Sequence, residues 1–378
     1  MNTPLATASG TASGNPSASS TANPAANSSG AAAGTSAGVA SGPAVTGLPV
    51  LPRPSADEFD AVLEHGAFTV LTQFGVIDAT GDDAASFLHG QLTNDTQHLD
   101  AANARLAGYC SAKGRLLASF LTWRSGETIR LLVSKDVQAA VQKRLSMFIL
   151  RAKAKLVDAS GELAVIGLAG DVRKALSGVF DALPDGVHVK VDGAAGSLIR
   201  VPDAFERLRY LWIGPKAQIE AHLPALGEKL KQVSPAVWDW LDIRAGEPRI
   251  TQPVVEQFVP QMVNFDVLGA VNFRKGCYPG QEVVARSQYR GTIKRRTSLA
   301  NVTGELDTVK AGVELFHSDD PGQPCGMVVN AASARDGGVD VLVEIKLAAL
   351  ESGSVHLGAA HGPALRFIAL PYGLPTEV

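Results

Sequence analysis

The chain of 378 residues has few cysteines, and its histidines do not pair. Cys110, Cys277 and Cys325 are odd in number and widely spaced, and no Cys-x-x-Cys pair occurs. Neither a zinc ribbon nor a ferredoxin-type cluster site can therefore be built from neighbouring ligands. The eight histidines form no His-x-His or His-x-x-x-His pair, so we predict no metal site. This cysteine usage fits a reducing, cytoplasmic setting best.

Charge is missing from the first 52 residues, which contain no Asp, Glu, Lys or Arg. Most of this segment is Ala, Ser, Gly, Thr, Asn and Pro, so folding it would cost backbone entropy with little apolar burial in return. We predict that residues 1–52 are a disordered low-complexity tail. A signal peptide would need a basic start and a continuous apolar core, and the segment has neither. No run of about 18 apolar residues occurs anywhere, so we expect no transmembrane helix and no membrane partner.

Several motifs of large enzyme classes are also absent. The chain has no Gly-x-Gly-x-x-Gly, no Walker-type phosphate loop, no His-Glu-x-x-His and no Gly-x-Ser-x-Gly. The sequence therefore gives no motif support for a dinucleotide-binding enzyme, a P-loop nucleotide hydrolase, a zinc protease or an α/β-hydrolase. The net charge of −3 and the pI near 6.3 argue against a surface that coats nucleic acid, so we do not expect direct nucleic-acid binding.

Beyond the tail, about 325 residues remain, more than one hydrophobic core usually supports. Three strand-like segments, 104–110, 115–123 and 128–133, are separated by hairpin-turn compositions. A helical pattern follows at 217–233. From Thr292 onward only short strands remain, as in a small barrel or sandwich. The pattern predicts an α+β fold with mainly antiparallel sheets and an all-β end.

One polar stretch, Asn272 to Glu282, has the composition of a functional loop. It reads Asn-Phe-Arg-Lys-Gly-Cys-Tyr-Pro-Gly-Gln-Glu, and its two glycines and proline exclude an ordinary helix or central strand. We predict an ordered loop that presents side chains to a ligand. The stretch comes just before the boundary of the all-β part, and pockets commonly form at such boundaries.

The side chains of this stretch allow several interpretations. Cys277 is either a reactive thiol activated by neighbouring cations or a small inert residue. Lys275 either donates to an anion or a ligand carbonyl, or is a surface lysine. Tyr278 either stacks on a heteroaromatic ring or packs at a domain boundary. Gln281 and Glu282 either form paired hydrogen bonds with an amidine-like edge or cap the next element.

Two further features of the sequence are candidates for function. Asp95, in a loop after a predicted short helix, is either a base that positions an amine or a turn residue. The segment from Arg274 to Arg296 carries seven basic residues and one acid, a local net charge of +6. It is either a solvated basic face or a seat for a polyanion such as a poly-acidic cofactor tail, RNA or an acidic partner.

The segment from Lys275 to Glu282 resembles the Lys-Gly-Cys-Tyr-x-Gly-Gln-Glu signature of the YgfZ family, relatives of the T-protein (aminomethyltransferase) of the glycine cleavage system. All seven specified positions match. Segments 87–95, 113–115 and 244–248 agree as well, and the likeness extends from about Phe68 to the C-terminus. The tail is outside it.

The resemblance implies three domains around a central opening, the last a small β-barrel. We accordingly predict a folate-binding T-protein-like α+β domain at 53–160 and 235–291. A second α+β domain would span 161–234, and the barrel would span 292–378.

The resemblance also implies tetrahydrofolate, or a derivative, as cofactor. Lys275 and Cys277 would be the functional pair, and Asp95 falls where the T-protein relatives place a catalytic aspartate. Tyr278, Gln281 and Glu282 would complete the folate contacts.

Two functions follow from the resemblance. The first is a folate-binding accessory factor for the assembly or repair of iron–sulfur client enzymes, including a tRNA-modifying one. A single cysteine does not hold a [4Fe–4S] cluster, so the thiol would assist transiently and the protein would not be an enzyme in the usual sense. The alternative is a tetrahydrofolate-dependent aminomethyl- or one-carbon transferase with Asp95 as its key group.

Overall fold

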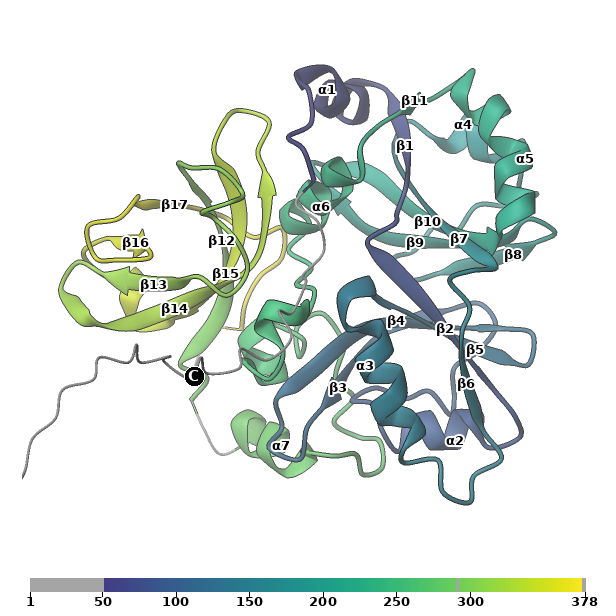
Figure 1. Cartoon of the computed structure of the whole chain (residues 1–378), viewed down its shortest axis with the longest axis horizontal. Coiled ribbons are helices and arrows are strands. Elements are labelled where there is room, and N and C mark those ends of the chain that lie inside the picture. The colour runs from purple at the N-terminus through teal and green to yellow at the C-terminus, as the bar shows by residue number, and fades with distance from the viewer. Residues whose placement is uncertain (1–50, 290–291, 376–378) are drawn as a thin grey trace, which may run out of the picture. The chain divides into compact units, whose positions relative to one another are not determined.

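The computed structural model describes residues 51–289 and 292–375 (Figure 1). The predicted tail, residues 1–52, falls outside the described residues except for its last two. The division into three domains with the boundaries given above stays a prediction.

Three sheets form the framework, and nearly all their strands pair antiparallel (Figure 1). The first sheet has the order β11-β1-β7-β10-β9-β8, and only β1 and β11 pair in parallel. Its strands are β1 (Gly66–Val70), β7 (Leu163–Gly170), β8 (Lys190–Gly193), β9 (Gly196–Ala204), β10 (Arg207–Pro215) and β11 (Lys231–Gln232). The second sheet has the order β3-β4-β5-β2-β6. Its strands are β2 (Phe74–Thr80), β3 (Ala104–Cys110), β4 (Leu116–Ser125), β5 (Thr128–Ser134) and β6 (Lys155–Asp158).

The third sheet follows the chain from residue 295 and has the order β16-β13-β14-β15-β12-β17. Its strands are β12 (Arg295–Val302), β13 (Glu314–His317), β14 (Asp320–Ser333), β15 (Val339–Lys346), β16 (Val355–Leu357) and β17 (Leu365–Ile368). β16 and β17 are its two edges, yet His356 pairs with Ala364 just before β17, so the sheet curls back on itself. The predicted α+β class, the hairpins of the second sheet and the barrel-like C-terminal sheet are confirmed.

Short helices connect these strands. They are α1 (Ala56–Glu64), α2 (Ala84–His89), α3 (Lys135–Ser146), α4 (Arg173–Leu176), α5 (Lys216–Gly227), α6 (Pro235–Arg244) and α7 (Gln281–Tyr289). Three turns of 3₁₀-helix lie at Gln252–Val254, Pro260–Val263 and Leu347–Leu350. The predicted helix 217–233 was too long: α5 ends at Gly227, and residues 231–232 pair with β1 as β11 instead. Hydrogen bonding to a neighbouring strand outweighed local helical periodicity.

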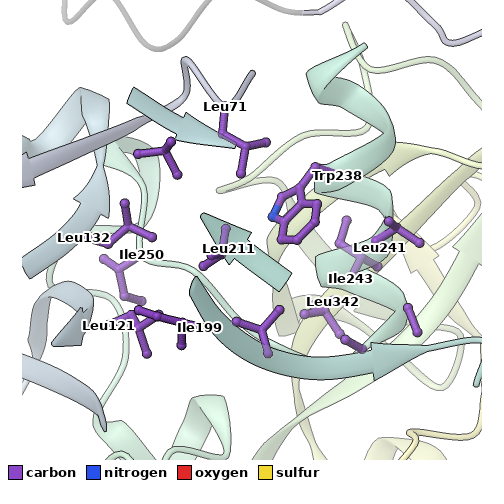
Figure 2. Packing of buried hydrophobic residues seen from close by; sticks show 14 of the residues in the cluster. Leu71, Leu121, Leu132, Ile199, Leu211, Trp238, Leu241, Ile243, Ile250 and Leu342 are labelled. Atoms are coloured by element: carbon purple, nitrogen blue, oxygen red, sulfur yellow. The ribbon is translucent and has the colours of Figure 1, made fainter. Parts of the chain in front are cut away.

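The largest buried cluster contains residues of all three sheets and of α6 (Figure 2). Ile199 and Leu211 come from the first sheet, Leu121 and Leu132 from the second, and Leu342 from the third. The cluster therefore packs the three sheets into one core.

Helix α6 supplies much of this cluster. Ser234 caps its first turn by accepting a hydrogen bond from Ala236 N at 3.2 Å, and Pro235 follows as the first helical residue. Trp238 of α6 packs directly on β7, where a Cβ at Gly167 would stand 2.7 Å from Cζ3 of the indole and still closer to Cε3. Glycine at this position lets the helix approach the sheet closely, which positions α6 against the cavity described below.

Candidate functional site

The signature stretch is a turn followed by a helix. Residues 275–280 are non-helical, as predicted, but Gln281 and Glu282 form the first turn of α7. The prediction of a loop through Glu282 is therefore wrong at its end. Gly280 makes the change of direction with a φ of +79°, and a Cβ there would stand 2.6 Å from Cα of Gly114. The turn is thus held against the β3–β4 hairpin.

Lys275 is buried although it is a lysine, with 9% of the residue exposed. Its ammonium donates to the Gly276 carbonyl at 3.1 Å and lies 4.7 Å from the centre of the Tyr278 ring. Burial lowers the pKa of Lys275, the nearby charges of Asp95 and Cys277 raise it, and the result is a pKa of about 8. A substantial fraction of this amine is therefore neutral near physiological pH.

Asp95 is held between two imidazoles. Its Oδ1 lies 2.9 Å from Nδ1 of His89, and its Oδ2 lies 2.8 Å from Nδ1 of His98. Burial raises the pKa of Asp95, but the backbone N–H and ring of His98 and the charge of His89 outweigh it and bring it down to about 2. Asp95 is therefore a carboxylate throughout the physiological range, and its Oδ1 also accepts the backbone N–H of His98 at 3.0 Å, as a turn residue does.

Hydrogen bonds from the segment before Asp95 bring it to the signature turn. The backbone N–H of Asn272 donates to Thr93 O at 2.9 Å, and the Thr93 hydroxyl donates to Ala270 O at 2.6 Å. The amide of Asn94 donates to the carbonyls of Leu106 at 2.7 Å and Gly269 at 2.8 Å. Residues about 180 positions apart in the chain therefore approach each other through one backbone–backbone bond and two bonds from side chains to backbone carbonyls.

Cys277 is exposed, whereas Cys110 and Cys325 are buried. Burial raises the pKa of Cys110 to about 12, so that thiol stays protonated. Of the three thiols in the chain, Cys277 is thus the one open to a ligand or a reagent.

The other signature residues are divided between burial and solvent. The Tyr278 residue is 7% exposed, and burial raises the pKa of its phenol. Glu282 points to solvent, its side chain 87% exposed, and pairs with Arg286 at 3.2 Å. Gln281 is half-buried. The structure thus brings together Lys275, Asp95 and Cys277, while Glu282 lies on the outer face of α7.

The basic stretch 274–296 is less free than its sequence suggests. Arg296 forms a buried two-point ion pair with Asp266, both contacts at 2.9 Å. Arg295 donates through Nη1 alone to both carboxylate oxygens of Glu344, at 2.8 and 2.9 Å. Arg296 connects the third sheet to the segment that contains Asp266, whereas Arg295 connects two neighbouring strands of the third sheet, β12 and β15. Both arginines are therefore paired, and neither belongs to a free basic face.

A pocket lies near the segment that carries Asp95, and its empty space, open solvent included, is about 660 Å³. Its walls are mostly apolar and come from the first and second sheets, from α6 and from the segment after α6. Leu106, whose carbonyl accepts from Asn94, is one of the lining residues, so the segment carrying Asp95 adjoins the wall. The signature residues 275–282 do not line the cavity.

The polar groups of this cavity include buried atoms that have no hydrogen-bond partner within the described residues. These atoms are Ser134 Oγ, His188 Nε2, Arg209 Nε, and Nε and Nη1 of Arg249. Unsatisfied buried donors cost free energy unless a ligand or water completes them. Burial also raises the pKa of Glu247 to about 8, against the lowering effect of Arg209.

Sequence reasoning did not assign any of these polar cavity residues to a site. Glu247 lies in segment 244–248, which contributed to the family resemblance, and Arg249 follows it directly. Glu247 and Arg249, close together just after the end of α6, were the signal in the sequence that could have indicated these polar cavity residues.

Within residues 51–289 and 292–375, no group of three His, Cys, Asp or Glu side chains could hold a metal ion. No helix in the same ranges is long and apolar enough to span a bilayer.

No protein-family model matches the chain. A relative named tRNA-modifying protein YgfZ from Edwardsiella ictaluri is 34% identical over 266 residues, covering 70% of this chain and 79% of its own. The protein of the same name from Serratia proteamaculans is 32% identical over 315 residues, covering 81% and 92%.

Among solved structures, aminomethyltransferase T of the glycine cleavage system from Bartonella henselae superposes with a TM-score of 0.68. The match covers 84% of this chain and 88% of that one, at 17% identity. At this identity the likeness shows a shared fold alone.

Proposed function

Since the chain belongs to the YgfZ family of tRNA-modifying proteins, we propose that it is a tetrahydrofolate-binding accessory protein for iron–sulfur enzymes. Its clients would be enzymes whose clusters it helps to assemble or repair, including a tRNA-modifying one, in the cytoplasm. The observation that carries the proposal is the clustering of a buried amine, a fixed carboxylate and an exposed thiol at Lys275, Asp95 and Cys277.

The cavity beside this cluster has the chemistry that a reduced pterin needs. Its apolar walls suit a flat ring, and the unpartnered donors of Arg209 and Arg249 suit the ring carbonyl and nitrogens. Glu247 would accept from the amino-amidine edge, an interaction that would also offset the cost of ionising a buried carboxyl. The residues present therefore fit the cofactor.

The signature residues would hold the part of the cofactor that leaves the cavity. In this proposal Lys275 and Asp95 contact this part of the cofactor directly. The Tyr278 ring packs against the Lys275 ammonium, and Gln281 and Glu282 form the outer edge of the site. When bound, tetrahydrofolate supplies a reduced pterin and a carrier of one-carbon units. Lys275 holds or releases a proton near pH 8 at its Nζ, and Cys277 presents its Sγ to the client.

A titration with tetrahydrofolate tests the cofactor assignment. We expect saturable binding by the wild type and a loss of at least about tenfold in affinity for Lys275→Ala, the range for removing a charged hydrogen bond. Glu247→Gln should weaken binding as well, whereas Lys174→Ala, an exposed lysine of α4, should leave it unchanged. Absence of binding by the wild type at physiological folate concentrations would remove the cofactor from the proposal.

The shared fold of an aminomethyltransferase and the ionised Asp95 favour one alternative, a folate-dependent one-carbon transferase. Two variants distinguish the accessory role from the transferase role. The accessory role requires Cys277, so Cys277→Ala should lower the activity of iron–sulfur enzymes in cells. If Cys277→Ala leaves that activity intact while Asp95→Ala abolishes it, the transferase is the better description.

A further inference from the structure

Three large apolar side chains face solvent directly after helix α3. Met147, Phe148 and Leu150 are 66%, 46% and 86% exposed. Ile149, which lies between two of them, turns inward and packs against the core of the second sheet. Apolar side chains exposed singly are ordinary on protein surfaces, but a contiguous group of them marks an interaction surface. We call residues 147–150 the apolar turn.

The backbone of the apolar turn is held by hydrogen bonds. The N–H groups of residues 147–149 each donate to a carbonyl three or four positions earlier, at 3.0 to 3.2 Å. The N–H of Leu150 donates to Phe148 O at 3.0 Å. A surface whose backbone is already ordered loses less conformational entropy when a partner covers it, so the apolar turn is preorganised for contact.

Basic residues surround the apolar turn in the sequence. Positions 143 to 155 contain five basic residues and no acidic one, and all five basic residues are exposed. Among the described residues, Lys153 pairs with Asp82 at 3.5 Å, and the other four form no ion pair. The apolar turn therefore has a positive surround, which we call the basic rim. Its members are Lys143, Arg144, Arg151, Lys153 and Lys155.

Helix α2 connects the basic rim to the candidate functional site. At the start of α2, Asp83 accepts the Lys153 N–H at Oδ2 at 2.7 Å and donates its own N–H to Lys153 O at 3.1 Å. At its end, Nδ1 of His89 lies 2.9 Å from Asp95 Oδ1. A helix of six residues is about 9 Å long. A partner that covers about 800 Å² of this protein can therefore contact both the rim and the site.

We propose that the apolar turn and its basic rim dock a protein surface that has acidic residues around an apolar centre. The inference deepens the proposed function and rests on it in one respect, because the partner would be the iron–sulfur client that approaches Cys277. Opposite charge on the partner would satisfy the rim, and its apolar centre would cover Phe148 and Leu150.

Other occupants fit these residues less well. A second copy of this chain would place two basic rims against each other, and like charges at an interface are unfavourable. Residues 1–50 of the chain contain no Asp or Glu, so they supply no opposite charge. Single-stranded RNA would be held by aromatic side chains stacked on its bases, and Phe148 is the one aromatic residue of the apolar turn.

Photo-crosslinking of the full chain in cells tests the proposal. A benzophenone-bearing phenylalanine replaces Leu150 in one sample and Leu350 in the control, because Leu350 is also apolar and exposed but lies outside the apolar turn. We expect a discrete protein adduct from position 150 that the control lacks. Mass spectrometry of the adduct should place the crosslink in a segment of the partner that carries acidic residues.

A charge swap then decides whether the rim makes the contact. Arg151→Glu combined with Lys155→Glu should lower the adduct yield at least about tenfold, since like charges now face each other. Replacing the acidic residues of the mapped segment with lysine should restore the yield. Both substituted residues are exposed, so the thermal unfolding and folate affinity of this variant should match those of the wild type.

Three results would overturn the proposal. The first is the absence of an adduct from position 150, and the second is an adduct whose yield does not respond to the charge swap. The third is sedimentation of the full chain with phosphatidylglycerol vesicles that Leu150→Ser abolishes, which would assign the surface to a membrane. A successful charge swap with a partner that holds no iron–sulfur cluster would support the docking surface and reject the proposed function, so the two failures are distinguishable.

Discussion

Replacing Lys275 with methionine is expected to stabilise the protein at neutral pH. Burial of the ammonium brings the pKa of Lys275 from 10.5 down to about 8, so the folded state disfavours the charge that the unfolded state accepts. Below about pH 8 the penalty is fully present, and as pH rises toward 10.5 it disappears because the lysine becomes neutral in both states. Methionine fills similar space without a charge.

Linkage gives the size of this effect. With a folded pKa of about 8 and an unfolded value of 10.5, the penalty is about 3 kcal/mol at pH 7, about 2 at pH 9 and about 1 at pH 10. Loss of the contact with the Tyr278 ring offsets about 1 kcal/mol of the gain at neutral pH. We therefore expect Lys275→Met to raise the free energy of unfolding by about 2 kcal/mol at pH 7.

Urea unfolding of the wild type and Lys275→Met at several pH values measures this directly. Lys174→Met is the matched control, because Lys174 is exposed and its replacement removes a charge from water only. The gain from Lys275→Met should shrink steadily between pH 7 and pH 10. A variant that is no more stable than the wild type at pH 7, or a gain that does not depend on pH, would refute a destabilising buried charge. The same variant should lose folate affinity, so stability and function would change in opposite directions.

Two further changes test the structure around the site. Gly280→Ala should lower the free energy of unfolding by about 1–3 kcal/mol, because Gly280 has a φ of +79° that is strained for alanine. Gly227→Ala, at a position with open space around it, should be tolerated. Chemical denaturation of both variants measures the difference in unfolding free energy. Asp266→Asn leaves the buried guanidinium of Arg296 without its carboxylate and should cost about 3–5 kcal/mol, visible as a lower melting temperature. Equal melting temperatures of Asp266→Asn and the wild type would show that the Arg296–Asp266 ion pair does not stabilise the protein.

The sequence by itself determined the local elements and the family. Hairpin-turn compositions identified three of the five strands of the second sheet, β3, β4 and β5, and the loss of helical periodicity after Thr292 identified the C-terminal sheet. Both signals depend only on residues close together in the chain, and so does the signature at 275–282. The prediction of a helix over 217–233 was wrong at its end for the opposite reason. Residues 231–232 pair with β1, which lies about 160 residues away in the chain.

Only the tertiary structure decided how charges and site residues combine. In the sequence, Arg295 and Arg296 contribute to the local net charge of +6. Their carboxylate partners lie 30 or more positions away in the chain, so the neighbouring residues do not reveal that these two arginines are paired. His89 was one of eight histidines without a pattern, and only the fold carries it to Asp95 and the signature turn. Burial likewise sets the pKa of Lys275, because desolvation depends on every element packed around the amine and not on its neighbours in the chain.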